Sequence, residues 1–332
     1  MMRVAVITDV RNVELREVPK PAPGPGEALV QIKACGLCTW EQRTYSGVDK
    51  ETPRPFAGGH ELSGVVVTIG EGTKTDLQVG DRVAVGPRVT GRHDLDRWRM
   101  NYAGLWGTMG LAEYKATSVS SLYKLAPDLP FEEGCFTEPV ACVIRSANKL
   151  NAKLGQDVVV IGAGPMGMLN MLIAKRRGTR LIVSEVDQRR NDYALELGAD
   201  LTVNPKTEDA PARVKEITGG KGADVVIVAI GNHTANLDAL NMVAEYGTVM
   251  LFASAHPVTD LTVDPNFIHR KQVTLTGSRN GSPESFETAT TLLSKRLLNV
   301  RPLIQQQVPM DQIKDAFELA IRPDTYRVIV TM

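Results

Sequence analysis

The pattern of hydrophobic positions divides the chain near Leu150. Before that residue, short apolar runs at 28–32, 62–69 and 79–85 are separated by turn residues, as in the Pro/Gly-rich stretch 19–27. Such runs predict an irregular, mostly β domain. From about Leu150 onward, apolar strands alternate with helix-length segments, which is typical of a parallel sheet with crossover helices.

The second half shows this alternation over most of its length. Its predicted strands are 158–161, 181–184, 224–230, 247–252 and 273–276. Two helical segments, 285–298 and 311–321, and a strand at 326–330 follow, and we expect this tail to pack back on the first domain. The chain is too long for one typical core. We therefore predict an α/β protein with a β-rich domain over 1–148, completed by 285–332, and a doubly wound parallel-sheet domain over 149–284.

A glycine-rich loop follows the strand 158–161, and its sequence is GAGPMG. Gly162 permits a tight strand-to-helix turn, Gly164 lets the backbone approach a pyrophosphate, and Gly167 allows close packing of the helix on the strand. Pro165 and Met166 lie where the helix begins, so that the positive end of its dipole faces the phosphates. This context predicts a dinucleotide site.

The acid at the end of the next strand bears on which dinucleotide is bound. Glu185 is placed to accept hydrogen bonds from the ribose hydroxyls and to repel a 2′-phosphate. NAD is therefore favoured over NADP. Arg189 and Arg190 lie close by and weaken that preference, since arginines can receive a 2′-phosphate.

A second chemical unit lies upstream and offers the ligand types of a catalytic zinc site. Cys38 supplies sulfur, His60 supplies nitrogen, and Glu61 or Glu138 supplies oxygen. Taken alone, His60 is more typical of a hydrogen-bonded structural histidine, and Glu61 of a carboxylate that supports the ligands. Spacing by itself leaves the metal site open.

Composition narrows the classes of function. Lys plus Arg and Asp plus Glu both number 38, so no overall basic field attracts nucleic acid or anionic lipid. No apolar run approaches the length of a membrane span, and the chain begins without a secretory signal. Four cysteines in 332 residues do not form a disulfide framework and fit a reducing compartment. We expect a cytoplasmic protein with a small-molecule substrate.

Together, these motifs resemble the zinc-dependent medium-chain alcohol dehydrogenase family, especially its polyol (sorbitol-like) branch. The matching segments occur in the family's order at 34–38, 59–64, 79–83, 138–142 and 162–167. The resemblance implies a GroES-like catalytic domain, a Rossmann domain and a substrate cleft between them. It also implies that Cys38 and His60 bind zinc together with Glu61 or Glu138, and that the protein is a homo-oligomer, with a tetramer favoured over a dimer.

Two departures from the family pattern stand out. Many members carry four closely spaced cysteines for a structural zinc, but residues 83–134 contain no cysteine here. We therefore expect one zinc per subunit, with the segment that carries His93, Trp98 and Trp106 held by packing or hydrogen bonds.

The second departure concerns the proton relay. The family usually has Ser or Thr two residues after the ligand cysteine, followed by Asp, whereas this chain reads Cys38-Thr39-Trp40-Glu41. Indole nitrogen donates but cannot relay a proton as a hydroxyl can. A relay through Thr39, Glu41 or ordered water stays open, and Trp40 is favoured slightly as a wall of the substrate pocket.

These features predict hydride transfer between NAD(H) and a secondary alcohol or ketone, most often a polyol or sugar derivative, at a zinc ion that acts as Lewis acid. An amino-alcohol or sugar-acid dehydrogenase, such as a threonine dehydrogenase-like enzyme, is an alternative with the same zinc and NAD. A non-catalytic nucleotide-binding relative is a second alternative, against which the retained ligand residues argue. A zinc-free quinone reductase-like enzyme would normally lack those residues.

Overall fold

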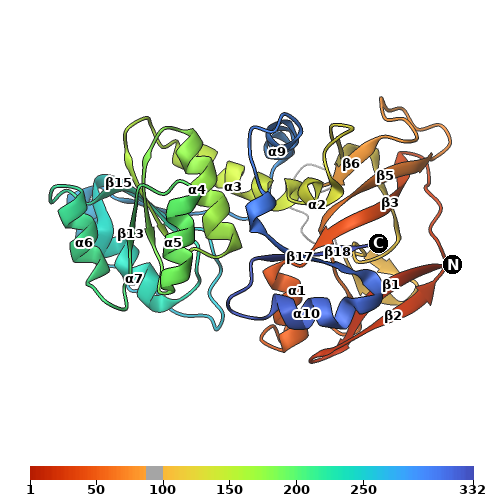
Figure 1. Cartoon of the computed structure of the whole chain (residues 1–332), viewed down its shortest axis with the longest axis horizontal. Helices are drawn as coiled ribbons and strands as arrows, with labels where there is room; N and C mark the ends of the chain where they lie inside the picture. Colours follow the sequence, from red (N-terminus) through yellow and green to blue (C-terminus); the bar gives the residue numbers. More distant parts are fainter. Residues whose placement is uncertain (87–99) are drawn as a thin grey trace. The chain divides into compact units, whose positions relative to one another are not determined.

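A computed structural model describes residues 1–86 and 100–332 and divides the chain into two units. Unit 1 comprises Met1–Ala141 and Gly281–Met332, and unit 2 comprises Cys142–Asn280. Figure 1 labels their helices and strands. His93 and Trp98 lie outside the residues described.

Unit 1 is built on two sheets. One has the strand order β2-β1-β4-β8-β7, and the other has the order β10-β6-β5-β3-β18-β17, with β9 also paired to β3. The strands are β1 Met2–Asp9, β2 Asn12–Val18, β3 Glu27–Gly36, β4 Phe56–Ala57, β5 Glu61–Ile69, β6 Arg82–Val85, β7 Met100–Tyr102, β8 Leu105–Gly107, β9 Tyr114–Ser118, β10 Leu122–Lys124, β17 Ile304–Pro309 and β18 Arg327–Thr331. The helices are α1 Thr39–Ser46, α2 Phe131–Gly134, α9 Pro283–Ser294 and α10 Ile313–Ala320.

The C-terminal tail belongs to unit 1, where it completes the sheet. Strand β18 pairs antiparallel with β3, so that Val330 lies opposite Cys35. Helix α10 packs its buried face on the same core, and the rings of Phe317 and Tyr45 stack 4.7 Å apart. Burial of two such aromatic side chains stabilises the packing of α10 on α1.

Unit 2 is a parallel sheet of six strands in the order β13-β12-β11-β14-β15-β16. The strands are β11 Asp157–Ile161, β12 Arg180–Ser184, β13 Leu201–Val203, β14 Ala223–Val228, β15 Val243–Leu251 and β16 Thr274–Gly277. The helices are α4 Pro165–Arg176, α5 Gln188–Glu196, α6 Ala210–Ile217, α7 His233–Met242 and α8 Pro265–Lys271, while α3 Thr137–Leu150 contains the boundary between the units. Figure 1 shows α4 and α5 on one side of the strands and α6 and α7 on the other. The predicted doubly wound parallel sheet is confirmed.

Some predicted boundaries were wrong for local reasons. The strand expected at 79–85 begins only at Arg82, because Gly80 takes a turn conformation with φ of 97° and Val79 is 65% exposed. The helix expected at 285–298 instead spans Pro283–Ser294. The Ser282 side chain caps its first turn, and Arg296 has a positive φ of 54° just after its end. Strand β17 and helices α1 and α3 were not anticipated.

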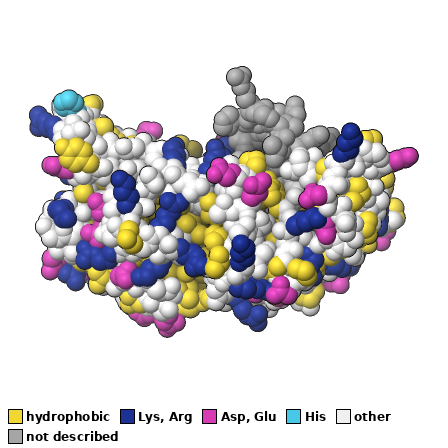
Figure 2. Space-filling view, turned by 90° about the horizontal axis from the view of Figure 1, so that it is seen from above, with side chains coloured by type: hydrophobic (Ala, Val, Ile, Leu, Met, Phe, Trp, Pro, Cys, Tyr) yellow, Lys and Arg dark blue, Asp and Glu magenta, His cyan; other side chains and the backbone are white. Residues whose placement is uncertain are grey.

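The surface carries both signs of charge. On the face drawn in Figure 2, Lys and Arg side chains are interspersed with Asp and Glu, in keeping with a net charge of zero. Within residues 1–86 and 100–332, no helix combines the length and the apolar character that a membrane span requires.

Candidate metal and nucleotide sites

The pairing of β3 with β5 brings the thiol and the imidazole together. The two strands run antiparallel, with Gly36 opposite Glu61 and Cys35 opposite Leu62. Cys38 follows the end of β3 and forms the N-cap of α1, and His60 immediately precedes β5. The chain therefore leaves one strand and enters the other at the same end of the sheet.

Four side chains with metal-binding atoms gather around the imidazole of His60. Ligand atoms of Cys38, Glu41 and His60 all lie within 4.8 Å of one another, and the same holds for His60, Glu61 and Glu138. Glu138 reaches this group from the first turn of α3. The four residues that the sequence suggested as zinc ligands thus fall into two groups that share His60, and Glu41 joins Cys38 in the first of them. Thiolate, imidazole and carboxylate are the donors that zinc prefers.

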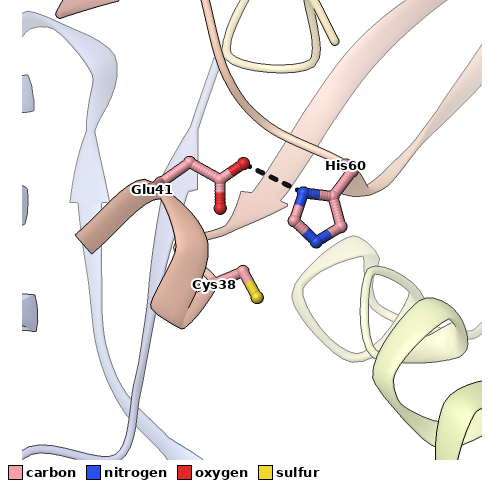
Figure 3. Close-up of side chains that lie close together, drawn as sticks. All are labelled: Cys38, Glu41 and His60. Carbon is pink, nitrogen blue, oxygen red and sulfur yellow. Dashed lines mark hydrogen bonds and ion pairs between the residues drawn. The ribbon is translucent and has the colours of Figure 1, made fainter. Parts of the chain in front are cut away.

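Glu41 fixes the orientation of the imidazole. Its Oε1 lies 2.9 Å from His60 Nδ1 and also accepts a hydrogen bond of 2.9 Å from the Gly59 amide. Figure 3 shows this contact, with the second ring nitrogen of His60 pointing away from Glu41. A carboxylate acceptor favours the tautomer protonated at Nδ1, which leaves the Nε2 lone pair for a metal.

Burial and neighbouring charges act together on these groups. Burial lowers the pKa of His60, but the negative charges of Glu41 and Cys38 outweigh it and raise that pKa well above its usual value. Burial, and then the charge of Glu61, raises the pKa of the Cys38 thiol. Burial raises the pKa of Glu61 to about 7, although Arg327 opposes the rise. A bound divalent cation would lower the pKa values of all three groups, because it favours thiolate, carboxylate and neutral imidazole.

Arg327 is a partner that the sequence analysis missed. Its guanidinium is 1% exposed, forms an ion pair with Glu61 (Nη2 to Oε1, 3.0 Å) and donates a hydrogen bond of 2.9 Å to the carbonyl of Leu37. Gly36 leaves room for this pair, since a Cβ there would lie 2.4 Å from Glu61 Oε2. The available signal was an arginine at the start of an otherwise apolar strand, where an unpaired charge is costly.

The structure gives the three relay candidates different surroundings. Thr39 is exposed at the start of α1. Trp40 donates its indole hydrogen to Thr52 Oγ1 at 3.0 Å and to Asp49 Oδ2 at 3.2 Å. Glu41 is fully buried and has one oxygen, Oε2, without a hydrogen-bond partner. A buried carboxylate oxygen without a partner is costly, and a bound cation would compensate it.

In the glycine loop, the backbone conformation and packing of the protein itself require glycine at only two of the three positions. Gly162 has a φ of 97°, and a Cβ on Gly167 would lie 1.8 Å from the Gly162 carbonyl oxygen. A Cβ on Gly164 would meet only Arg190 Nη1, at an ordinary contact distance of 3.6 Å. Gly164 is also the N-cap of α4, whose first residues are Pro165 and Met166. Its missing side chain leaves space beside the helix N-terminus, where a phosphate is favoured.

The acid after β12 lies against this loop. Glu185 is 8% exposed, and its carboxylate accepts hydrogen bonds from the amides of Ala163 at 2.7 Å and Asp187 at 3.0 Å. Arg189 is instead paired with Asp187 at 2.8 Å and is largely exposed. Of the two arginines, Arg190 is therefore the one beside the glycine loop.

Two families of known proteins match the chain. The alcohol dehydrogenase GroES-like domain matches residues 24–128, and the zinc-binding dehydrogenase family matches residues 165–295. The first match lies in unit 1 and includes Cys38 and His60. The second begins at Pro165, inside the glycine loop.

Individual relatives are similar over nearly the whole chain. The sorbitol dehydrogenase of Halalkalibacterium halodurans is 29% identical, over 96% of this chain and 95% of its own length. The solved 2R,3R-butanediol dehydrogenase of Bacillus subtilis is 27% identical, with a TM-score of 0.87 and complete coverage of both chains. A Sinorhizobium meliloti protein solved with NADP is 26% identical, with a TM-score of 0.88 over 100% of this chain and 99% of its own.

The buried ion pair gives a stability prediction. Arg327→Met should lower the free energy of unfolding of unit 1 by about 3–5 kcal/mol, because it leaves Glu61 buried without its partner. Adding Glu61→Gln should recover part of that loss, since the remaining group is neutral. Denaturant unfolding followed by tryptophan fluorescence reports on unit 1, because the sequence has no tryptophan within residues 142–280 of unit 2. Equal stability of the single variant and the wild type would show that the pair is not needed.

Proposed function

We propose, from the premise that this chain belongs to the family of zinc-type medium-chain alcohol dehydrogenases, that it transfers a hydride between a nicotinamide dinucleotide and a secondary alcohol or ketone. The observation that carries the proposal is the cluster of thiol, imidazole and carboxylates around His60. A dinucleotide loop of the Rossmann type in the same chain supports it. The relatives that act on sorbitol and butanediol favour a polyol or sugar derivative as substrate.

The donor set fits a zinc ion. Cys38 would supply sulfur and His60 would supply Nε2, while the third ligand comes from one of two acids. Because Glu61 is ion-paired with Arg327, we assign the third position to Glu138. When bound, zinc acts as a Lewis acid that favours the alkoxide form of an alcohol or polarises a carbonyl. We expect one ion per chain, since residues 83–134 contain no cysteine.

The surrounding residues hold the ligands in place. Glu41 accepts the Nδ1 hydrogen of His60 and so orients the ring, and the Gly59 amide in turn holds the same carboxylate oxygen. Arg327 balances the charge of Glu61 beside the site. Outer partners of this kind raise ligand basicity, and their loss typically lowers metal affinity or activity about 10–100-fold.

The proton of the alcohol needs a route that does not use Trp40. The indole hydrogen is engaged by Asp49 and Thr52, and indole has no acceptor site. Thr39 is exposed at the start of α1. We expect the proton to leave through ordered water, with Thr39 as the nearest hydroxyl along the chain.

For the cofactor, the surroundings of the glycine loop favour NAD. Glu185 lies against the loop and would repel a 2′-phosphate while accepting hydrogen bonds from the ribose. Arg190 lies beside Gly164 and would interact with the phosphates. The relative solved with NADP shows that this fold also accepts the phosphorylated cofactor.

Replacing the thiol tests the metal assignment. Cys38→Ser should reduce bound zinc from about one ion per chain to a small fraction, and kcat/KM should fall more than about 100-fold, beyond the effect of outer partners. Metal analysis and NAD reduction over a panel of secondary alcohols measure both. Cys142→Ser is the matched control, since Cys142 lies outside both ligand groups. Full zinc content together with turnover in Cys38→Ser would refute the assignment.

A pair of glycine variants tests the nucleotide loop. Gly164→Ala should keep the melting temperature of the protein yet weaken NAD binding, because its methyl group fits the chain but fills the phosphate space. Gly167→Ala should lower the melting temperature itself, since its Cβ would lie 1.8 Å from a backbone oxygen. Calorimetry and NAD titration separate the two effects. Unchanged NAD affinity in a folded Gly164→Ala protein would argue against a nucleotide here.

Cofactor choice should depend on Glu185. Glu185→Ser should lower the ratio of kcat/KM for NAD to that for NADP by about tenfold or more, since hydrogen bonds to a charged group contribute about 1.5–3 kcal/mol. Steady-state kinetics with both cofactors measure the ratio. Glu196→Ser, the same change at an exposed position on α5, is the control. A ratio that stays constant in both variants would leave Glu185 without a role in selectivity.

A further inference from the structure

The side chain of Trp40 is held by its polar edge. Its indole hydrogen is shared by Thr52 Oγ1 and Asp49 Oδ2, at 3.0 and 3.2 Å. The Asp49 carboxylate also accepts hydrogen bonds from the Thr52 hydroxyl and from the amides of Glu51 and Thr52. The orientation of the ring is therefore fixed, and the only hydrogen-bonding group of the Trp40 side chain is already used.

The Trp40 ring lies among other aromatic rings, next to the candidate metal ligands. The Trp40 ring lies 5.8 Å from the His60 ring and 5.1 Å from the Phe56 ring, between ring centres. The Trp106 ring meets it edge-on, at 6.5 Å and 88°. Phe56 is fully buried behind them, and the two tryptophans are half-buried. We call the two partly exposed rings, Trp40 and Trp106, the aromatic wall.

On the basis of the proposed function, we propose that the aromatic wall makes the enzyme select a ring-shaped polyol or sugar over an open-chain polyol. Trp40 stands two residues after Cys38, and its ring is adjacent to that of His60. A substrate whose oxygen is bound between Cys38 and His60 therefore places its neighbouring carbons against the indole.

The preference follows from where each kind of substrate carries its hydroxyl groups. The exposed part of the Trp40 side chain is aromatic and its indole hydrogen is already engaged, so a hydroxyl pressed against this ring loses its water partners without replacement. A six-membered polyol ring points its equatorial hydroxyls outward and presents C–H bonds on its faces. An open-chain polyol has hydroxyls along its whole length and turns some of them toward the wall in any conformation.

The test compares two probes with equal numbers of carbons and hydroxyls, myo-inositol and sorbitol. For the zinc-loaded wild type with NAD, kcat/KM for myo-inositol should exceed that for sorbitol by about tenfold to hundredfold, the range that apolar pockets achieve against an added hydroxyl. Trp40→Ser should reduce this ratio by about tenfold or more. Trp40→Phe keeps an aromatic face and loses the indole hydrogen, so it should retain most of the ratio.

Binding measurements make the comparison independent of turnover. Calorimetric titration of each protein with each probe, in the presence of NAD, should give the same order of affinities. Zinc content and melting temperature of each variant show whether it is folded and loaded. Wild-type preference for sorbitol, no binding of myo-inositol, or an unchanged ratio in loaded Trp40→Ser would each overturn the proposal. Failure of the proposed function is distinct from these results, because no alcohol of any shape would then be oxidised.

Discussion

The antiparallel register of β3 and β5 is the constraint on which the proposed metal site depends. Because Gly36 lies opposite Glu61, the residues that follow β3 and precede β5 meet at one end of the sheet, and Cys38 and His60 are among them. A slip of one residue would turn the side chains of β5 to the opposite face. This register also requires glycine at position 36, since a side chain there would collide with the Glu61 carboxylate.

Near the ends of β3 and β5, unit 1 buries the carboxyl groups of Glu41, Glu61 and Glu138, and burying several acidic side chains together destabilises a protein core. Glu41 is held by His60 and the Gly59 amide, and Glu61 is held by Arg327. Each pair offsets part of the cost of burying a charge, yet Glu41 still has an oxygen without a partner. Concentrated, partly compensated charge of this kind is expected at a functional site rather than in ordinary packing. A cation would complete the compensation and link metal binding to the stability of unit 1.

The chain shares its fold with the dehydrogenases it resembles, and one of its departures from the family pattern lies beside the candidate metal site. Similarity at 29% identity extends over 96% of the chain for the sorbitol dehydrogenase relative. Trp40 nevertheless replaces the hydroxyl expected after the ligand cysteine, and its polar edge is committed to Asp49 and Thr52. The similarity to these relatives therefore supports the reaction class, while our proposal on substrate choice rests on the aromatic wall.

The sequence by itself determined the family, the parallel sheet and the glycine turn, because these depend on short-range periodicity and on motifs a few residues long. Gly162 is needed for its positive φ, and Gly167 is needed because a Cβ there would collide with the Gly162 carbonyl, so both requirements arise within a few residues of the chain. Only the tertiary structure decided that Glu41 orients His60 and that Arg327 pairs with Glu61, since those contacts join helix α1 to the start of β5 and the C-terminal strand to the N-terminal sheet. The late start of β6 and the presence of β17 likewise depend on strand pairing and turn geometry, which the hydrophobic pattern alone does not contain.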